Sequence, residues 1–195
     1  MYLSYEQKGE PAHIIVIQPN IDANTEKFAL SEEAQLNKFE NIVLSVLDDS
    51  IDYIVGPETM LIQAIDEDKR AQYKSIRFLK QLIQPYENLN LITGAVTYKT
   101  FNHLQKTDIS RQMGDSGLWY EIYNSSLQLN QVDSVPLYHK SKLVVGAEEM
   151  PFMDVLKPLF GDVILNFGGT IGSHGTQRKR EYFVSNDGRF KVGTA

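Results

Sequence analysis

The chain has 195 residues, of which 42% are hydrophobic and 23% charged, and its formal net charge is −6. That length and apolar content suit one globular domain, and the acidic balance excludes the basic surface with which proteins bind the phosphates of nucleic acids. The sequence contains no cysteine, so disulfides, thiolate metal sites and a cysteine nucleophile are excluded within these residues.

The sequence also gives no indication of metal binding or membrane insertion. Its histidines lack the i, i+4 and His-x-His spacings that are typical of metal sites, so we expect no metal. No apolar run approaches the roughly 18 residues of a spanning helix, and the start has no signal-peptide pattern. Taken alone, the fragment is predicted to be soluble. The histidines concerned are His13, His103, His139 and His174.

The first quarter of the chain predicts a strand and a helix. Residues 1–10 are polar and aperiodic, and we interpret them as a linker or the edge of a fragment. The β-branched run at 12–18 predicts a strand that is buried on both faces. Ser31 and the polar residues after it predict the start of an amphipathic helix that extends to about Asp48.

The middle of the chain predicts two further buried strands and a second helix between them. Residues 51–59 predict a short strand that ends at a Gly-Pro break. Residues 66–86 predict an amphipathic helix, which is acidic in its first turn and ends before Pro85. Residues 88–98 predict another buried strand. Residues 99–117 are polar and irregular, which is typical of a functional or mobile loop.

From Leu118 the pattern changes to antiparallel hairpins. Residues 118–140 alternate in hydropathy on either side of a Gln-Val-Asp-Ser turn, which predicts one hairpin. Residues 180–195 predict a second hairpin across Asn186-Asp187-Gly188. The order strand, helix, strand, helix, strand and then antiparallel pairs predicts an α/β fold with a mixed sheet and helices on at least one face.

Charged residues follow two of the predicted strands. Glu58, in VGPET, lies just past a strand's carboxyl end, which is where open α/β sheets bind ligands. Lys140 ends the strand VPLYHK, and Glu148 and Glu149 follow in a loop. Taken one at a time, the glutamates are explained as ordinary loop carboxylates. Lys140 is explained as a lysine whose aliphatic stem covers apolar surface. Together they form a candidate charge network that could abstract a proton and stabilise an oxyanion, although it lacks a nucleophile.

The segments that carry these residues resemble a known family. AHIIVIQPNI, VGPET, TGAV, YNSSL, YHKSKLV and the acid that follows are similar, in order and spacing, to the nitrilase (carbon–nitrogen hydrolase) superfamily. The resemblance extends from about residue 12 to residue 195. It implies a nitrilase-like αββα sandwich, with mixed sheets and flanking helices. Residues 11–195 would be the catalytic domain, which uses a Glu–Lys–Cys triad.

Within the superfamily, the stretch from Lys140 to Phe152 is most similar to the apolipoprotein N-acyltransferase family. The resemblance implies that Glu58 is the general base, that Lys140 stabilises the oxyanion and that Glu148 is the additional loop glutamate. Lys142 lies where the family varies and is not expected to be catalytic. The implied reaction moves an acyl chain from a phospholipid to the N-terminal amine of a diacylglyceryl lipoprotein, without a metal or organic cofactor.

The family's cysteine follows a strand like RFKVGTA, and the printed chain stops at Ala195. We therefore expect a fragment that is truncated at its C-terminus, ends just before its nucleophile and is inactive by itself. In the family this domain faces the periplasm on the bacterial inner membrane and is flanked by membrane-spanning helices. The remaining alternatives are a soluble nitrilase-type amidase or hydrolase, and a natural chain without a nucleophile that serves as a binding module.

Overall fold

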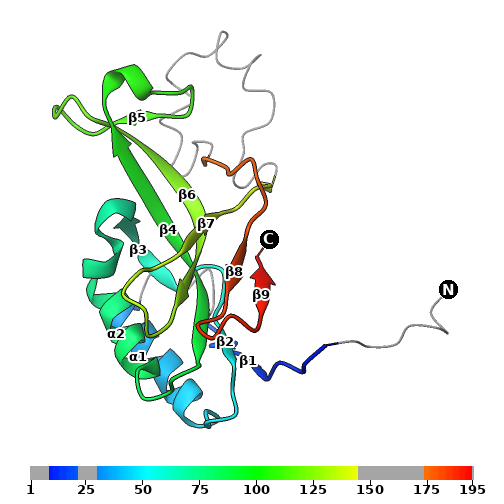
Figure 1. The fold of residues 1–195 in the computed structure, drawn as a ribbon. Coiled ribbons are helices and arrows are strands. Elements are labelled where there is room, and N and C mark those ends of the chain that lie inside the picture. Colours follow the sequence, from blue (N-terminus) through cyan, green and yellow to red (C-terminus); the bar gives the residue numbers. More distant parts are fainter. Residues whose placement is uncertain (1–8, 22–29, 145–173, 195) are drawn as a thin grey trace.

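The structure is a computed structural model that describes residues 9–21, 30–144 and 174–194, drawn in colour in Figure 1. These residues form a mixed α/β fold. In chain order the elements are β1 (Ile14–Val16), α1 (Glu32–Leu44), β2 (Tyr53–Val55), β3 (Leu61–Asp66), the 3-10 helix η1 (Glu67–Gln72), α2 (Lys74–Ile83), β4 (Asn90–Phe101), the 3-10 helix η2 (His103–Gln105), β5 (Arg111–Gln112), β6 (Trp119–Leu129), β7 (Leu137–His139), β8 (Tyr182–Val184) and β9 (Lys191–Gly193).

Most strands in the described ranges belong to one mixed sheet. Its main path runs β1-β2-β4-β6-β5, with β3 also pairing with β4 and β7 with β6. Strands β1, β2, β3 and β4 are parallel, whereas β6 is antiparallel to β4, β5 and β7. The β4–β6 pair is long and extends beyond the helices toward β5 (Figure 1). Strands β8 and β9 form a separate antiparallel hairpin.

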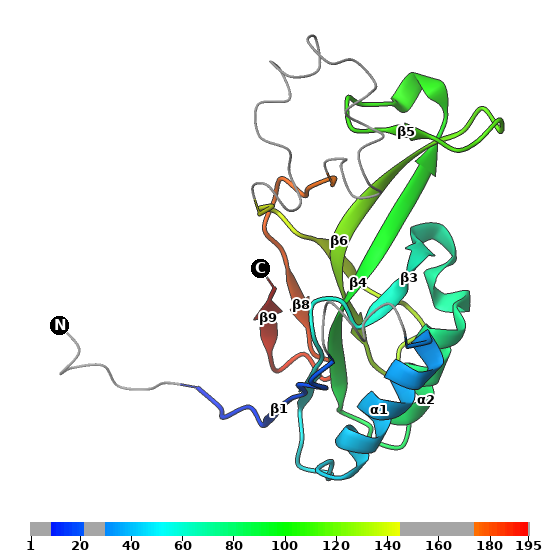
Figure 2. The same ribbon diagram turned by 180° about the vertical axis from the view of Figure 1, so that it is seen from behind.

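The two faces of the sheet are covered by different elements. Ile54 and Leu91 pack into the main core with α1 and α2, which lie together on one side of the sheet in Figure 2. The neighbouring residues Tyr53 and Ile92 point the other way and pack with Phe183 of the hairpin. Successive side chains of a strand point to opposite faces of the sheet. The register of β2 on β4 therefore determines both which residues contact the helices and which contact the hairpin. The described part is therefore layered as helices, sheet and β8–β9 hairpin.

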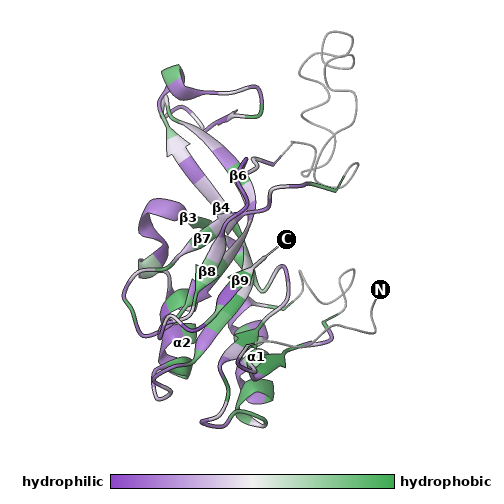
Figure 3. Cartoon of the chain, turned by 45° about the vertical axis from the view of Figure 1, so that its right-hand side comes forward, coloured by the Kyte–Doolittle hydropathy of each residue, from purple (hydrophilic) through white to green (hydrophobic). Residues whose placement is uncertain are grey.

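The hydropathy pattern follows this layering. Figure 3 shows hydrophobic residues concentrated where the helices and the hairpin cover the sheet, and more hydrophilic ones along the far part of the β4–β6 pair. Burial of apolar surface stabilises the fold where the layers meet. No helix among the described residues is both long enough and apolar enough to span a membrane.

Several predicted elements are confirmed with small changes of length. Helix α1 begins after Ser31, whose side chain accepts a hydrogen bond from the Ala34 backbone N–H, but it ends at Leu44 rather than near Asp48. Both antiparallel hairpins form, one from β6 and β7 and the other from β8 and β9. The turn of the second hairpin contains Gly188 at φ 76°, a conformation that glycine adopts without strain.

Two predictions about elements are wrong, and one strand is missing from them. Strand β1 is not buried on both faces: Ile14 and Val16 are 53% and 73% exposed, because β1 lies at the end of the sheet path. Strand β3 was not predicted. The helix expected over 66–86 is divided at Tyr73, whose extended backbone separates η1 from α2. The Tyr73 hydroxyl instead accepts a hydrogen bond from the Asp66 backbone at 2.8 Å, which ties it to the end of β3.

The segment 99–117 is less irregular than expected. Strand β4 continues to Phe101, and η2 and β5 follow within the segment. Its Thr107 and Ser110 hydroxyls both donate hydrogen bonds to Oε1 of Glu121 on β6, at 2.7 and 2.8 Å. Burial raises the pKa of Glu121, but these hydrogen bonds and one from Tyr123 outweigh it and hold the pKa below its usual value. The Glu121 carboxylate thus anchors the segment 99–117 to the sheet.

Candidate functional site

Glu58 and Lys140 meet at one edge of the sheet although 82 positions separate them. Lys140 Nζ lies 2.8 Å from Glu58 Oε1, within hydrogen-bond and ion-pair distance. The Lys140 side chain is 17% exposed and that of Glu58 is 62% exposed. The Glu58 side chain is therefore largely exposed, whereas the Lys140 side chain is mostly covered by the protein. This contact agrees with the expectation that Glu58 and Lys140 come together in a charge network.

The backbone after β2 places Glu58 over β4. The Gly56 N–H donates to the Ile92 carbonyl at 2.8 Å, and the Gly94 N–H donates to the Pro57 carbonyl at 3.0 Å. A Cβ atom at Gly56 would lie 2.7 Å from the Thr93 hydroxyl oxygen. The two glycines, which stand in the VGPET and TGAV segments, therefore allow the turn to lie closely against the sheet.

The register of β7 against β6 places Lys140. Ser125 is opposite His139, and the next residue, Lys140, donates its backbone N–H to the Asn124 carbonyl at 2.8 Å. The Asn124 side chain also donates to Glu58 Oε1 at 2.8 Å. One carboxylate oxygen of Glu58 thus accepts hydrogen bonds from a cation and from an amide.

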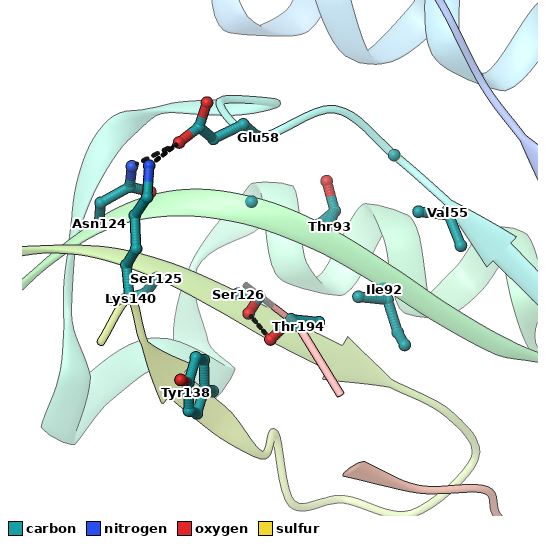
Figure 4. A pocket seen from close by; sticks show the side chains of 12 residues that line it. Val55, Glu58, Ile92, Thr93, Asn124, Ser125, Ser126, Tyr138, Lys140 and Thr194 are labelled. Carbon is teal, nitrogen blue, oxygen red and sulfur yellow. Dashed lines mark hydrogen bonds and ion pairs between the residues drawn. The ribbon is translucent and has the colours of Figure 1, made fainter. Parts of the chain in front are cut away.

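The pair lies beside a cavity of about 380 Å³. Figure 4 shows Lys140 and Asn124 directed toward Glu58, and Thr194 beside Ser126 on the neighbouring wall. The hydroxyls of Ser126 and Thr194 are 2.6 Å apart, so the residue after β9 is bound to β6. The cavity therefore combines a charged end with hydroxyl and apolar walls. Its remaining lining residues are Val55, Gly56, Ile92, Thr93, Gly94, Ser125 and Tyr138.

Of the three catalytic candidates, the structure brings two together. Glu148 lies outside the described residues. Asn124, by contrast, is part of the observed site and was not selected from the sequence. It lies in YNSSL, a segment that contributes to the family resemblance but carries no separate signal for Asn124. Asn124 pairs with Val96 of β4 and lies one residue before the part of β6 that pairs with β7. The sequence does not show this position, because it depends on the order of the strands in the sheet.

A second carboxylate, which is buried, lies near the site. Glu67 Oε1 accepts hydrogen bonds from His139 Nε2 at 2.7 Å and from the Thr97 hydroxyl at 2.9 Å. Burial raises the pKa of Glu67, but the hydrogen bond and charge of His139, the Thr97 hydroxyl and Lys99 together outweigh it, so the pKa lies below its ordinary value. Glu67 is thus ionised at neutral pH inside the fold.

Comparison with known proteins does not assign the chain to a family. No protein-family model matches the chain, and no curated protein matches it. In the part of the chain that the structure describes, no three His, Asp or Glu side chains are grouped so that they could hold a metal ion. The features of the described residues that point to a function are therefore the Glu58–Lys140 pair, its cavity and the residues that hold the pair in place.

Proposed function

We propose that this chain carries the acid–base and oxyanion-binding part of an acyl-transfer site of the nitrilase type, on a nitrilase-like αββα sandwich. The observation that carries the proposal is the 2.8 Å contact between Lys140 Nζ and Glu58 Oε1. The family resemblance requires these two residues to meet, and they do so from separate strand ends. The layering of helices, mixed sheet and hairpin is consistent with the same fold.

In this proposal Glu58 is the general base and Lys140 the oxyanion donor. Glu58 takes the proton of a cysteine thiol, and the thiolate attacks the acyl carbonyl of an ester to form a carbon–sulfur bond. Lys140 donates a hydrogen bond to the oxyanion that develops on the carbonyl oxygen. Glu58 then returns the proton to the departing alkoxide as the carbon–oxygen bond breaks. An amine attacks the thioester in the second half of the reaction, which releases the thiol and forms an amide.

The cysteine is proposed to follow β9 in the full-length protein. Support comes from Thr194, which lines the same cavity as Glu58 and Lys140 and is bound to Ser126. A residue a few positions further along the chain is within reach of the cavity, since each residue of extended chain covers about 3.3 Å. Glu148 is proposed as the further loop carboxylate of the site.

More specifically, we propose that the full-length protein is an apolipoprotein N-acyltransferase. Its acyl donor would be a phospholipid and its acceptor the N-terminal amine of a diacylglyceryl lipoprotein. The full-length protein would lie in the bacterial inner membrane, with this domain on the periplasmic side. The stretch from Lys140 to Phe152 supports this choice over a soluble amidase, in which water would be the acceptor.

The full-length protein, extended through its cysteine, tests the proposal. With a phospholipid donor and a lipopeptide acceptor we expect an acyl-enzyme by intact mass spectrometry and an amide product. Glu58→Gln and Lys140→Met should each lower the rate of acylation by about 100-fold or more. Lys142→Ala is the matched control, because Lys142 is exposed two positions away, and should leave the rate unchanged.

The other outcomes separate the alternatives. Hydrolysis of a small amide or nitrile without transfer to an amine would indicate a nitrilase-type hydrolase instead. A full-length chain without a cysteine, which binds a ligand at the cavity without turnover, would indicate a binding module. An unchanged acylation rate in both Glu58→Gln and Lys140→Met would refute the assignment of the two residues.

A further inference from the structure

Glu67 and His139 form a largely buried pair, and His139 directly precedes Lys140 in the chain. Their side chains are 10% and 17% exposed, and Glu67 Oε1 lies 2.7 Å from His139 Nε2. Glu67 begins η1, whereas His139 ends β7, so the pair connects segments 72 positions apart. Lys140 is the residue directly after His139. The pair therefore holds the backbone from which the Lys140 side chain extends toward Glu58.

The imidazole of His139 is held on its face as well as at its nitrogen. The Tyr123 ring stacks on it, with the ring centroids 3.9 Å apart and the planes at 14°. Tyr123 is itself fixed, because its hydroxyl donates to Glu121 Oε2 at 2.7 Å. The His139 backbone N–H donates to Gln177 Oε1 at 3.1 Å. These contacts leave the ring little freedom to rotate, so movement of Glu67 would be transmitted to the end of β7.

The same carboxylate also reaches the cavity wall. The Thr97 hydroxyl donates to Glu67 at 2.9 Å and lies 2.7 Å from the Ser125 hydroxyl. A hydroxyl has one proton, and Thr97 gives it to the carboxylate, so Ser125 is the donor in the second bond. Ser125 lines the cavity beside Lys140. The hydrogen bonds therefore run from Ser125 through Thr97 to Glu67, and their direction is set by the negative charge.

We propose that Glu67 is a positioning residue for the Glu58–Lys140 site. From one buried oxygen it holds the imidazole of His139, and through it the end of β7, and orients the Ser125 hydroxyl through Thr97. An effect of Glu67 on catalysis rests on the proposed function, whereas the positioning of Lys140 by Glu67 does not. Glu67 is thus connected to Lys140 through His139, and to the cavity wall through Thr97 and Ser125.

The test measures the reactivity of Lys140 in the 195-residue chain. Reductive methylation followed by peptide mass spectrometry gives the rate at Lys140 relative to Lys74 and Lys179, two exposed lysines. In Glu67→Gln we expect the Lys140 rate to rise about threefold to tenfold, the equivalent of one net hydrogen bond, because Lys140 spends less time against Glu58. The unfolding midpoint of each variant is measured in parallel.

Asp66→Asn is the matched control. Asp66 is also a buried carboxylate and precedes Glu67, but it contacts Lys69 and the Asp68 N–H rather than His139. The control should leave the Lys140 rate unchanged even if it lowers stability. An equal rise in both variants, or no rise in Glu67→Gln, overturns the proposal. If Glu67→Gln does not fold, His139→Phe keeps the stacking on Tyr123, removes the hydrogen bond and should raise the Lys140 rate in the same way.

Activity of the full-length protein is a separate measurement. There, Glu67→Gln should lower kcat with little change in KM, since positioning of the oxyanion donor matters most in the transition state. If the wild-type protein transfers no acyl group, the proposed function fails, and the Lys140 rates still decide the positioning role. If it transfers acyl groups but the Lys140 rates do not change, only the positioning proposal fails.

Discussion

The backbone of Glu58 lies directly on Gly94. A Cβ atom at position 94 would stand 1.6 Å from the Glu58 carbonyl oxygen and 2.6 Å from its Cα atom. Both neighbours are backbone, so a side-chain rotation cannot relieve the clash. The closeness explains why the turn after β2 can place a carboxylate above β4, within reach of a lysine from β7.

Gly94→Ala is therefore expected to displace the turn that carries Glu58. We expect a loss of about 1–3 kcal/mol in the free energy of unfolding, the usual cost of overpacking, measured by denaturant titration. The Glu58–Lys140 contact should loosen, with faster methylation of Lys140. Gly193→Ala is the control, because a Cβ there meets nothing within 4 Å. Equal stability of the two variants would show that the turn adapts without cost.

The 195-residue chain should form no acyl-enzyme. It contains no cysteine, and the proposed chemistry passes through a thioester. Incubation with phospholipid or with an activated short-chain ester, followed by intact mass spectrometry, should show the unmodified mass. A stoichiometric acyl adduct on a residue of the cavity, such as Ser126 or Thr194, would contradict this and identify a different nucleophile.

Stability should decrease in acid partly because of Glu67. Its folded pKa is lower than the ordinary value of 4.5, so the unfolded chain takes up the proton first as pH falls. The contribution of Glu67 is fully present above pH 4.5 and is lost as pH falls through the lower folded pKa. Denaturant midpoints between neutral pH and about pH 3 should fall less steeply in Glu67→Gln than in the wild-type chain. If the midpoints of the two chains fall in parallel with pH, Glu67 does not contribute to the loss of stability in acid.

Arg189 should hold the β8–β9 hairpin to the sheet. Its guanidinium contacts Asp52 next to β2 at 2.6 Å and also pairs with Asp187 in the hairpin turn. A hydrogen bond from the Ser185 hydroxyl, together with the side-chain and backbone hydrogen bonds and the charge of Arg189, holds the pKa of Asp187 at about 2. Arg189→Gln should cost about 1–2 kcal/mol and speed hydrogen exchange in β8 and β9. Arg77→Ala, at an exposed position of α2, should change neither.

The sequence by itself determined the features that depend on near neighbours. Ser31 caps α1 because the accepting hydroxyl and the Ala34 N–H are three residues apart. The β8–β9 turn forms at Asn186-Asp187-Gly188 because Gly188 adopts positive φ. The ends of β2 and β7 were located by hydropathy, and this is why Glu58 and Lys140 could be proposed as partners. Patterns of this kind arise from hydrogen bonds between near neighbours and from the alternation of hydropathy along a strand.

Only the tertiary structure decided which residues come together from distant segments. Nothing local distinguishes the exposed edge strand β1 from a buried one, since exposure depends on which strand lies beside it. Tyr73 interrupts the expected helix because its hydroxyl is bound at the end of β3. Glu67 and His139 have no sequence signal as a pair, and they meet because the registers of β7 on β6 and of β6 on β4 bring His139 to η1. A shift of one residue in either register would turn the side chains to the opposite face and separate them.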